Sequence, residues 1–199
     1  LSNIGALQTI QDWQDLSTLP DPNLQILNVI RNEEIYSAVN ELETLKYTAP
    51  APLVFATPNL SGSQIATVTA DRKSLQVTNS AESDFKLVAQ GDQISKPTWD
   101  RDGNIYFSDF GQGVREITRD GSLRPVSVDA STLGTNDQVK QVLVSSDGVR
   151  VAVVLSNGIQ DVVAVGAVFK TDSETRIIGL HRIERSITTI RDIVWSSPT

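Results

Sequence analysis

The stretch from Val139 to Leu180 decides the fold, and its sequence is VKQVLVSSDGVRVAVVLSNGIQDVVAVGAVFKTDSETRIIGL. Its apolar, β-branched runs are Val139–Val144, Val151–Leu155, Val162–Phe169 and Thr175–Leu180. The dipeptides Asp147-Gly148 and Asn157-Gly158 separate the first three runs, and such dipeptides are typical of tight turns between strands. The unit is therefore predicted to form four strands in an antiparallel meander.

Two of these runs, Val151–Leu155 and Val162–Phe169, are apolar at nearly every position. Strands with one face in water alternate apolar and polar residues, whereas strands covered on both faces do not. In a β-propeller the sheets stack face to face around an axis, which covers their central strands in this way. The two runs therefore favour a propeller blade.

The same order of strand, Asp-Gly turn and strand occurs earlier in the chain. Strand-forming runs there are Pro97–Trp99, Ile105–Phe107, Val114–Thr118 and Leu123–Val128. A more degenerate copy comprises Gln64–Ala70, Leu75–Asn79 and Phe85–Ala89, and Ile193–Trp195 starts another copy. The equivalent residues Trp99, Val144 and Trp195 are about 45 to 50 residues apart, which is the length of a propeller blade.

The sequence thus predicts an all-β fold, a β-propeller present as an incomplete set of about four antiparallel blades. A hairpin over residues 26–39 is a candidate partial blade. Residues 1–23 are assigned to an N-terminal segment or the end of a preceding domain, and residues 24–199 to a partial propeller whose last blade is truncated. We expect further sequence or a second copy of the chain to complete the ring.

Composition narrows the classes of function. Apolar residues make up 39% and charged residues 21% of the chain, which is globular usage. The net charge of −7 disfavours phosphate backbones and anionic membrane surfaces, so we expect no nucleic-acid partner. Without cysteine the chain has no disulfide, thiolate zinc site or cysteine nucleophile. Because it begins at Leu1 and contains no methionine, we interpret it as a processed or excised piece with any lipid anchor upstream.

An ordered set of motifs runs through the chain: SKPTWDRDG at 95–103, GVREITRDG at 113–121, VSSDGVRVAVV at 144–154, VGAV at 165–168 and IRDIVW at 190–195. This set resembles the propeller of the actinobacterial LpqB lipoprotein family. The run from Asp147 to Ala152 is the most specific, because a Trp-x-x-Asp-Gly pattern alone occurs in many propellers. The resemblance covers about residues 51–199.

Members of this family are exported, lipid-anchored through an upstream cysteine, and carry a GerMN-type domain before the propeller. The resemblance implies an extracytoplasmic location at the cell membrane and an accessory role beside the MtrA–MtrB two-component system in cell-envelope homeostasis and division. The implied partner is the extracytoplasmic region of the sensor kinase MtrB. This chain departs from the family in lacking the lipobox, a recognisable GerMN segment and the C-terminal part of the propeller, so we expect the anchor in a parent protein.

Two candidate reactive motifs have structural explanations. His181, the only histidine, lies on a predicted strand, and no glycine-framed serine accompanies it in the sequence. The run Asp100–Asn104 resembles a calcium loop. Its sixth and twelfth positions, Ile105 and Gly111, lack the glycine and the glutamate that such a loop needs. A tight turn that uses the backbone freedom of Gly103 is predicted instead.

Aromatic, basic and glycine-rich positions are explained in the same way. Trp99 and Trp195 recur at one repeat position and are predicted to pack between blades, with ligand platforms at the propeller mouth as the alternative. Two loose clusters of arginines are predicted to lie on solvated strand faces, with binding of an acidic partner as the alternative. The first cluster is Arg115, Arg119 and Arg124, and the second is Arg182, Arg185 and Arg191. Gly111–Gly113 is predicted to be a hairpin loop, because no helix follows it to hold a phosphate. We therefore assign no catalytic, cofactor-binding or metal-binding residue and no cofactor.

The first functional hypothesis is a protein-binding module of the cell envelope that is not an enzyme. The alternative is a propeller hydrolase or a sugar- or peptide-binding protein of the cell envelope. Its acid and base would come from the aspartates Asp102, Asp109, Asp120 and Asp147. Nearly all of these stand in turns, which already explain an aspartate at that position. A generic scaffold propeller that binds peptides on its top face is a third reading.

Overall fold

The computed structural model describes residues 51–79, 84–129, 133–134, 136–171, 173–183 and 188–195. The chain divides into two compact units, Leu1–Tyr47 and Thr48–Thr199, and all described residues lie in the second unit. The assignments of residues 1–23 and of the hairpin over 26–39, with the boundary between them, lie outside the described residues and stay predictions.

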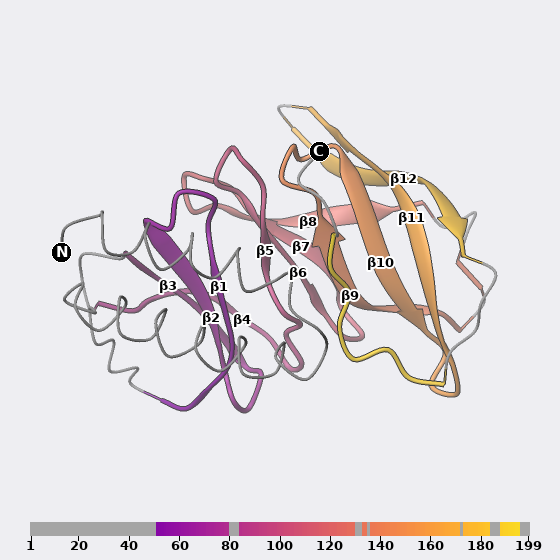
Figure 1. The fold of residues 1–199 in the computed structure, drawn as a ribbon, viewed down its shortest axis with the longest axis horizontal. Helices are drawn as coiled ribbons and strands as arrows, with labels where there is room; N and C mark the ends of the chain where they lie inside the picture. Colours follow the sequence, from indigo (N-terminus) through magenta and orange to yellow (C-terminus); the bar gives the residue numbers. More distant parts are fainter. Residues whose placement is uncertain are drawn as a thin grey trace, which may run out of the picture. The chain divides into compact units, whose positions relative to one another are not determined.

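The regular structure of the described residues consists of twelve strands. They are β1 (Leu53–Pro58), β2 (Gln64–Thr69), β3 (Ser74–Asn79), β4 (Lys86–Gln90), β5 (Thr98–Trp99), β6 (Ile105–Asp109), β7 (Gly113–Ile117), β8 (Leu123–Val128), β9 (Gln138–Val144), β10 (Arg150–Ser156), β11 (Asp161–Lys170) and β12 (Thr175–Arg182). Consecutive strands pair antiparallel in the sets β1–β4, β5–β8 and β9–β12, and each set is a propeller blade (Figure 1). The predicted all-β propeller fold is confirmed.

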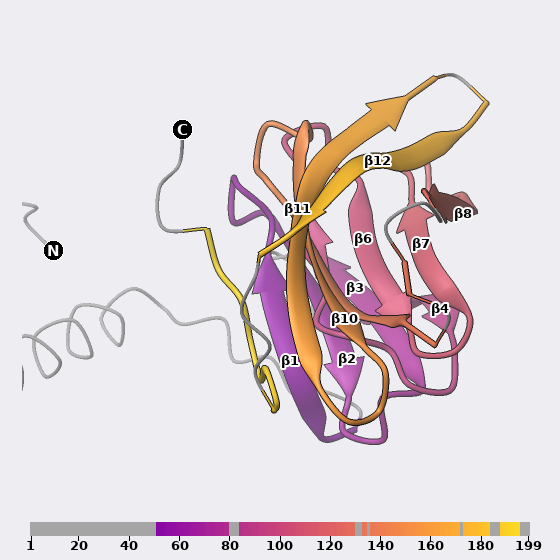
Figure 2. The same ribbon diagram turned by 90° about the vertical axis from the view of Figure 1, so that its right-hand side faces the viewer.

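The second and third blades are joined through their last strands. β8 and β12 pair in parallel, with Thr175 opposite Val126 and Ile177 opposite Val128. β12 belongs to the long hairpin with β11 that Figure 2 shows. The pairing merges β5–β12 into one eight-stranded sheet, whereas β1–β4 form a sheet of their own.

Two apolar clusters form the core. One cluster contains residues of the first and second blades, such as Val68, Leu75 and Phe107, all of them fully buried. The other contains residues of the second and third blades, such as Tyr106 and Val153. Each fully buried side chain of this size stabilises the fold by roughly 1.5 to 3 kcal/mol relative to its exposed form. The stacking of blades is therefore held mainly by burial between their faces.

The continuous apolar run of β10 is buried at every position except Arg150. This confirms the prediction of a strand covered on both faces. β11 has buried positions among half-buried ones, so the same prediction holds for it only in part. Both strands are interior in the sheet, β10 between β9 and β11 and β11 between β10 and β12, so the difference lies in what covers their faces and not in their strand pairing.

Five turns share one hydrogen-bonded form, in which an N–H donates to the carbonyl three residues earlier and the donor residue has a positive φ. The donors, with φ between 59° and 88°, are Gly62, Arg72, Gly103, Gly121 and Gly148. The predicted tight turn at Gly103 is thus confirmed. Glycine adopts this backbone freely, but a residue with a Cβ is strained there by roughly 1 to 2 kcal/mol. Arg72 is the non-glycine residue that accepts this strain among the described residues.

The predicted strand at Ile193–Trp195 is not formed. Residues 190–195 are held beside β9 by side-chain bonds, from Lys140 Nζ to the Ile190 carbonyl at 3.1 Å and from Gln141 Nε2 to Asp192 Oδ1 at 2.9 Å. A strand needs a neighbour that pairs with its backbone, and these bonds do not supply one. The described residues contain no helix long and apolar enough to cross a bilayer.

Candidate functional site

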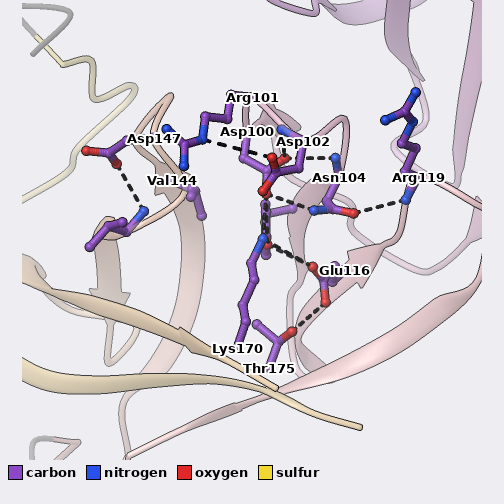
Figure 3. Close-up of polar contacts among 12 residues, drawn as sticks. Asp100, Arg101, Asp102, Asn104, Glu116, Arg119, Val144, Asp147, Lys170 and Thr175 are labelled. Atoms are coloured by element: carbon purple, nitrogen blue, oxygen red, sulfur yellow. Dashed lines mark hydrogen bonds and ion pairs between the residues drawn. The ribbon is translucent and has the colours of Figure 1, made fainter. Parts of the chain in front are cut away.

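A buried polar network joins the second and third blades (Figure 3). The ammonium of Lys170 on β11 lies 2.6 Å from Asp100 Oδ2 and 3.8 Å from Oε1 of Glu116 on β7. Tyr106 on β6 donates its hydroxyl to Glu116 Oε1 at 2.8 Å. Thr175 on β12 donates to Glu116 Oε2 at 2.6 Å. Side chains of both blades therefore meet around two buried carboxylates and the half-buried ammonium of Lys170.

Asp100 is the centre of this network, and its side chain is fully buried. Besides Lys170, its carboxylate accepts the backbone N–H of Asp102 at 3.0 Å and both the backbone and side-chain N–H of Asn104 at 2.9 Å. Burial raises the pKa of Asp100, but the hydrogen bonds from Lys170 and Asn104 outweigh burial and hold the pKa below its usual range. Asp100 is therefore an anion at neutral pH.

The chemistry of the network is structural. Asp100 and Glu116 are two neighbouring carboxylates, but their side chains are only 0% and 3% exposed and both are occupied by donors. A general acid or base must reach a proton of its substrate, which these groups do not. The described residues contain no cluster of three or more side chains suited to hold a metal ion. The former calcium-loop candidate thus serves as the anchor between blades.

Trp99 is buried between the first and second blades. Its indole N–H donates to the carbonyl of Thr57 on β1 at 2.9 Å, and its ring belongs to the apolar cluster with Val68 and Phe107. Packing between blades is therefore confirmed for Trp99. Trp195, at the equivalent repeat position, has its ring 5.8 Å from the Arg150 guanidinium, and its buried N–H finds no acceptor in the described part of the chain.

Replacing Trp99 by phenylalanine is expected to lower the free energy of unfolding by about 1 to 2 kcal/mol, because it removes the bond from the buried indole to the Thr57 carbonyl. The control is Trp195→Phe, which loses no such bond and is expected to cost less. Urea denaturation followed by far-UV circular dichroism measures both. Equal losses in the two variants would show that the bond between blades contributes nothing.

A cavity of 210 Å³ lies at the end of the blades that carries the β2–β3, β6–β7 and β10–β11 turns, called the hairpin end below. Its lining residues are Arg72, Gln93, Phe110, Lys140 and Ser156. The turns of the first two blades are tied together through residues 93–94, because Ile94 N–H donates to the Arg72 carbonyl at 2.8 Å and Phe110 N–H to the Gln93 carbonyl at 3.2 Å. The cavity is therefore built by three successive blades.

Exposed apolar side chains stand on the same turns. Phe110 is 36% exposed and Ile159, in the β10–β11 turn, is 78% exposed. The side-chain oxygen of Asn157 accepts the N–H groups of Ile159 and Gln160, each at 2.9 Å, and this fixes the turn without help from the Ile159 side chain. The hairpin end thus combines a cavity with two exposed apolar side chains on neighbouring turns.

Known relatives match this fold and its motifs. A family model for the lipoprotein LpqB β-propeller domain matches residues 37–199. The chain belongs to the LpqB propeller family. Lipoprotein LpqB of Cutibacterium acnes (strain DSM 16379 / KPA171202) is 27% identical over 169 residues, which cover 82% of this chain and 27% of that protein. The chain therefore spans about a quarter of the length of this LpqB relative.

A solved structure shows the same fold outside the LpqB family. Kuenenia stuttgartiensis hydrazine synthase is similar with a TM-score of 0.55 and 20% sequence identity, over 72% of this chain and 40% of that chain. At this level of identity the likeness concerns the fold alone. The resemblance to LpqB, carried by the motifs between residues 95 and 195, is confirmed by the family match.

The aspartates considered for a hydrolase are spread over separate turns and, for Asp109, the end of strand β6. Asp102 and Asp109 lie near opposite ends of β6. Asp120 accepts the hydroxyl of Thr118 in the β7–β8 turn. The hydroxyl of Ser145 lowers the pKa of Asp147 to about 2, so this carboxylate is an anion at neutral pH and no general acid. Each of these aspartates has a local structural environment, and no observation favours the hydrolase alternative.

The remaining candidates lie on strands and loops. His181 lies exposed on β12, opposite Val165. Arg115 donates to Gln112 at 2.7 Å, and Arg182 pairs with Asp137. Arg185 lies outside the described residues. The loop at Gly111–Gly113 connects β6 to β7 and is the predicted hairpin loop.

Proposed function

We propose that this chain is the partner-binding module of an extracytoplasmic, lipid-anchored protein that assists the MtrA–MtrB two-component system in cell-envelope homeostasis. The partner in this proposal is the extracytoplasmic region of the sensor kinase MtrB. The match of the LpqB propeller model to residues 37–199 carries the proposal. The name of the Cutibacterium acnes relative, a lipoprotein, supports a parent protein attached to the membrane outside the cytoplasm.

The polar groups of the blades support binding over catalysis. The two neighbouring carboxylates of the fold, Asp100 and Glu116, are buried and occupied by donors. The hairpin end offers a cavity of 210 Å³ beside exposed Phe110, with exposed Ile159 on the next turn. Apolar tips on preordered turns suit a protein interface, in which a few buried anchors supply most of the affinity. The net charge of −7 argues against nucleic acid as the partner.

Cross-linking of the full parent protein in the membranes of its own organism is expected to capture MtrB. Ile159→Asp should reduce this capture about tenfold or more, because a charge replaces an apolar anchor at the interface. The matched control is Val149→Asp, since Val149 is 54% exposed in the β9–β10 turn at the other end of β10. Quantitative mass spectrometry of the captured proteins gives the readout. Absence of MtrB from the wild-type capture would contradict the proposed partner.

A further inference from the structure

The β2–β3 turn carries an arginine where related turns carry glycine. Arg72 donates its N–H to the Thr69 carbonyl at 2.8 Å and has a φ of 59°. The four other turns of this form use Gly62, Gly103, Gly121 and Gly148. Non-glycine residues with a strained backbone of this kind cluster at functional sites. The geometry of the turn alone gives no reason for a long cationic side chain at this position.

Arg72 is one of the residues that line the hairpin-end cavity. Its guanidinium lies 5.3 Å from the centre of the Phe55 ring, and the residue lines the cavity with Phe110 and Gln93. Within the described residues the guanidinium forms no ion pair. An aromatic ring below a guanidinium leaves its N–H edge available for a planar acceptor.

The second cation of the cavity is already neutralised. Lys140 Nζ lies 2.6 Å from Asp161 Oδ2 and donates to the Ile190 carbonyl at 3.1 Å. Asp161 also accepts the Ile190 N–H at 2.7 Å. The charge of Arg72 is therefore the uncompensated charge among the described residues that line this cavity, and its sign favours an anionic group.

We infer that the hairpin-end cavity binds a carboxylate of the partner protein, held by the guanidinium of Arg72 beside an apolar residue that contacts Phe110. The inference rests on the proposed role as a protein-binding module and names the chemistry that this end recognises. Arginine pairs with carboxylates through two parallel N–H···O bonds. A volume of 210 Å³ suits one anchoring group and not a whole small-molecule ligand, for which pockets of about 300 Å³ or more are typical. An acidic side chain and a C-terminal carboxylate share this chemistry.

Three short peptides distinguish these sources in a titration of the full ¹⁵N-labelled chain. The first is acetyl-Gly-Leu-Glu-Gly-amide, the second is acetyl-Gly-Leu-Gly-Gly with a free C-terminal carboxylate, and the third is the neutral acetyl-Gly-Leu-Gln-Gly-amide. We expect the resonances of Arg72 Nε and of the Gln93 and Phe110 amides to shift when at least one carboxylate peptide is added. The affinity of that peptide, taken from these shifts, should be at least tenfold higher than the affinity of the neutral peptide. Tighter binding of the first peptide would indicate an acidic side chain as the ligand, and tighter binding of the second would indicate a C-terminal carboxylate. Equal responses to all three, or no response to any, would overturn the inference.

Arg72→Gly separates recognition from folding. Glycine fits the positive φ of the turn, so the thermal midpoint should stay equal or rise, while the affinity for the carboxylate peptide should fall at least tenfold. Arg72→Lys keeps the charge but loses the two-pronged geometry, and we expect an intermediate affinity. Unchanged affinity in Arg72→Gly would overturn the role of the guanidinium.

The two proposals fail separately. Capture of MtrB by the wild-type parent protein together with unchanged capture by the Arg72→Gly variant would leave the proposed function standing and overturn the carboxylate site. Loss of MtrB from the wild-type capture, together with a peptide response that depends on Arg72, would overturn the partner and keep the site.

Discussion

Replacing Lys170 by methionine is expected to lower the free energy of unfolding of the Thr48–Thr199 unit by about 3 to 5 kcal/mol. The ammonium of Lys170 lies 2.6 Å from Asp100 and 3.8 Å from Glu116, whose side chains are almost completely buried. Methionine keeps most of the volume but leaves two buried carboxylates without the positive charge of Lys170. Urea denaturation at pH 7, followed by far-UV circular dichroism, measures the loss.

The pH dependence identifies the cause of this loss. In the wild type the pKa of Asp100 is held below its usual range, so its contribution is present above the unfolded pKa of about 3.9 and is lost as the pH falls through the folded pKa. Without Lys170, burial is expected to raise the pKa of Asp100 in the folded state. The deficit of Lys170→Met should therefore be smaller at pH 4 than at pH 7, and it should shrink further as the pH falls through the folded pKa of Asp100.

The matched control for this variant is Lys86→Met. Lys86 lies exposed on β4, so its replacement is expected to change the free energy of unfolding by less than about 0.5 kcal/mol at either pH. If Lys170→Met proved as stable as Lys86→Met, the network would not hold the second and third blades together.

Most strands could be located from the sequence because turn-forming dipeptides such as Asp-Gly and Asn-Gly stand at their ends. The runs of β9, β10 and β11 end at Asp147-Gly148 and Asn157-Gly158, whose residues form the turns. Within such units the pairing is local, since consecutive strands form hairpins. A local pattern therefore sufficed for the blade.

β1 was not among the predicted strands. Pro52 and Pro58 stand at its two ends, and proline lowers the expectation of a strand because it lacks an N–H for the ladder. In the structure β1 is an edge strand of its sheet, where a proline at the end is tolerated. β1 was missed because its position at the edge of the sheet cannot be derived from the spacing of residues in the sequence.

The polar network could not be predicted because its partners are distant in the chain. Glu116 lies between Arg115 and Ile117 and shares a strand face with Val114, so its neighbours do not show whether its charge faces solvent or the interior. Its partners come partly from other blades: β12 lies beside β8 and brings in Thr175, 59 residues further on. The parallel pairing of β8 with β12 leaves no periodic signal in the sequence. The presence of Lys170 at the end of a long apolar strand was the one local hint.

Gly91→Ala is expected to destabilise the fold by about 2 to 4 kcal/mol through a contact that has no signature in the sequence. A Cβ at this position would lie 2.4 Å from Oδ2 and 2.7 Å from Cγ of Asp109. Asp109 is fully buried, and its Oδ1 accepts the N–H groups of Asp92 at 3.1 Å and Gln93 at 2.9 Å. The backbone at Gly91 is itself held by its N–H bond to the Lys73 carbonyl. Because neither side can yield without losing buried hydrogen bonds, the added methyl group causes overpacking.

A double-mutant cycle tests whether the Asp109 carboxylate is the obstacle to Gly91→Ala. Asp109→Ala removes the clashing atoms, so Gly91→Ala should cost less than about 1 kcal/mol in that background. Asp109→Asn keeps the volume and removes the charge, so the full cost should remain if the clash is steric. Urea denaturation of the six chains gives the coupling energies. The contact with Asp109 is removed only in the Asp109→Ala background. If Gly91→Ala cost the same in the wild-type, Asp109→Ala and Asp109→Asn backgrounds, the strain would therefore lie elsewhere in the segment that enters β5.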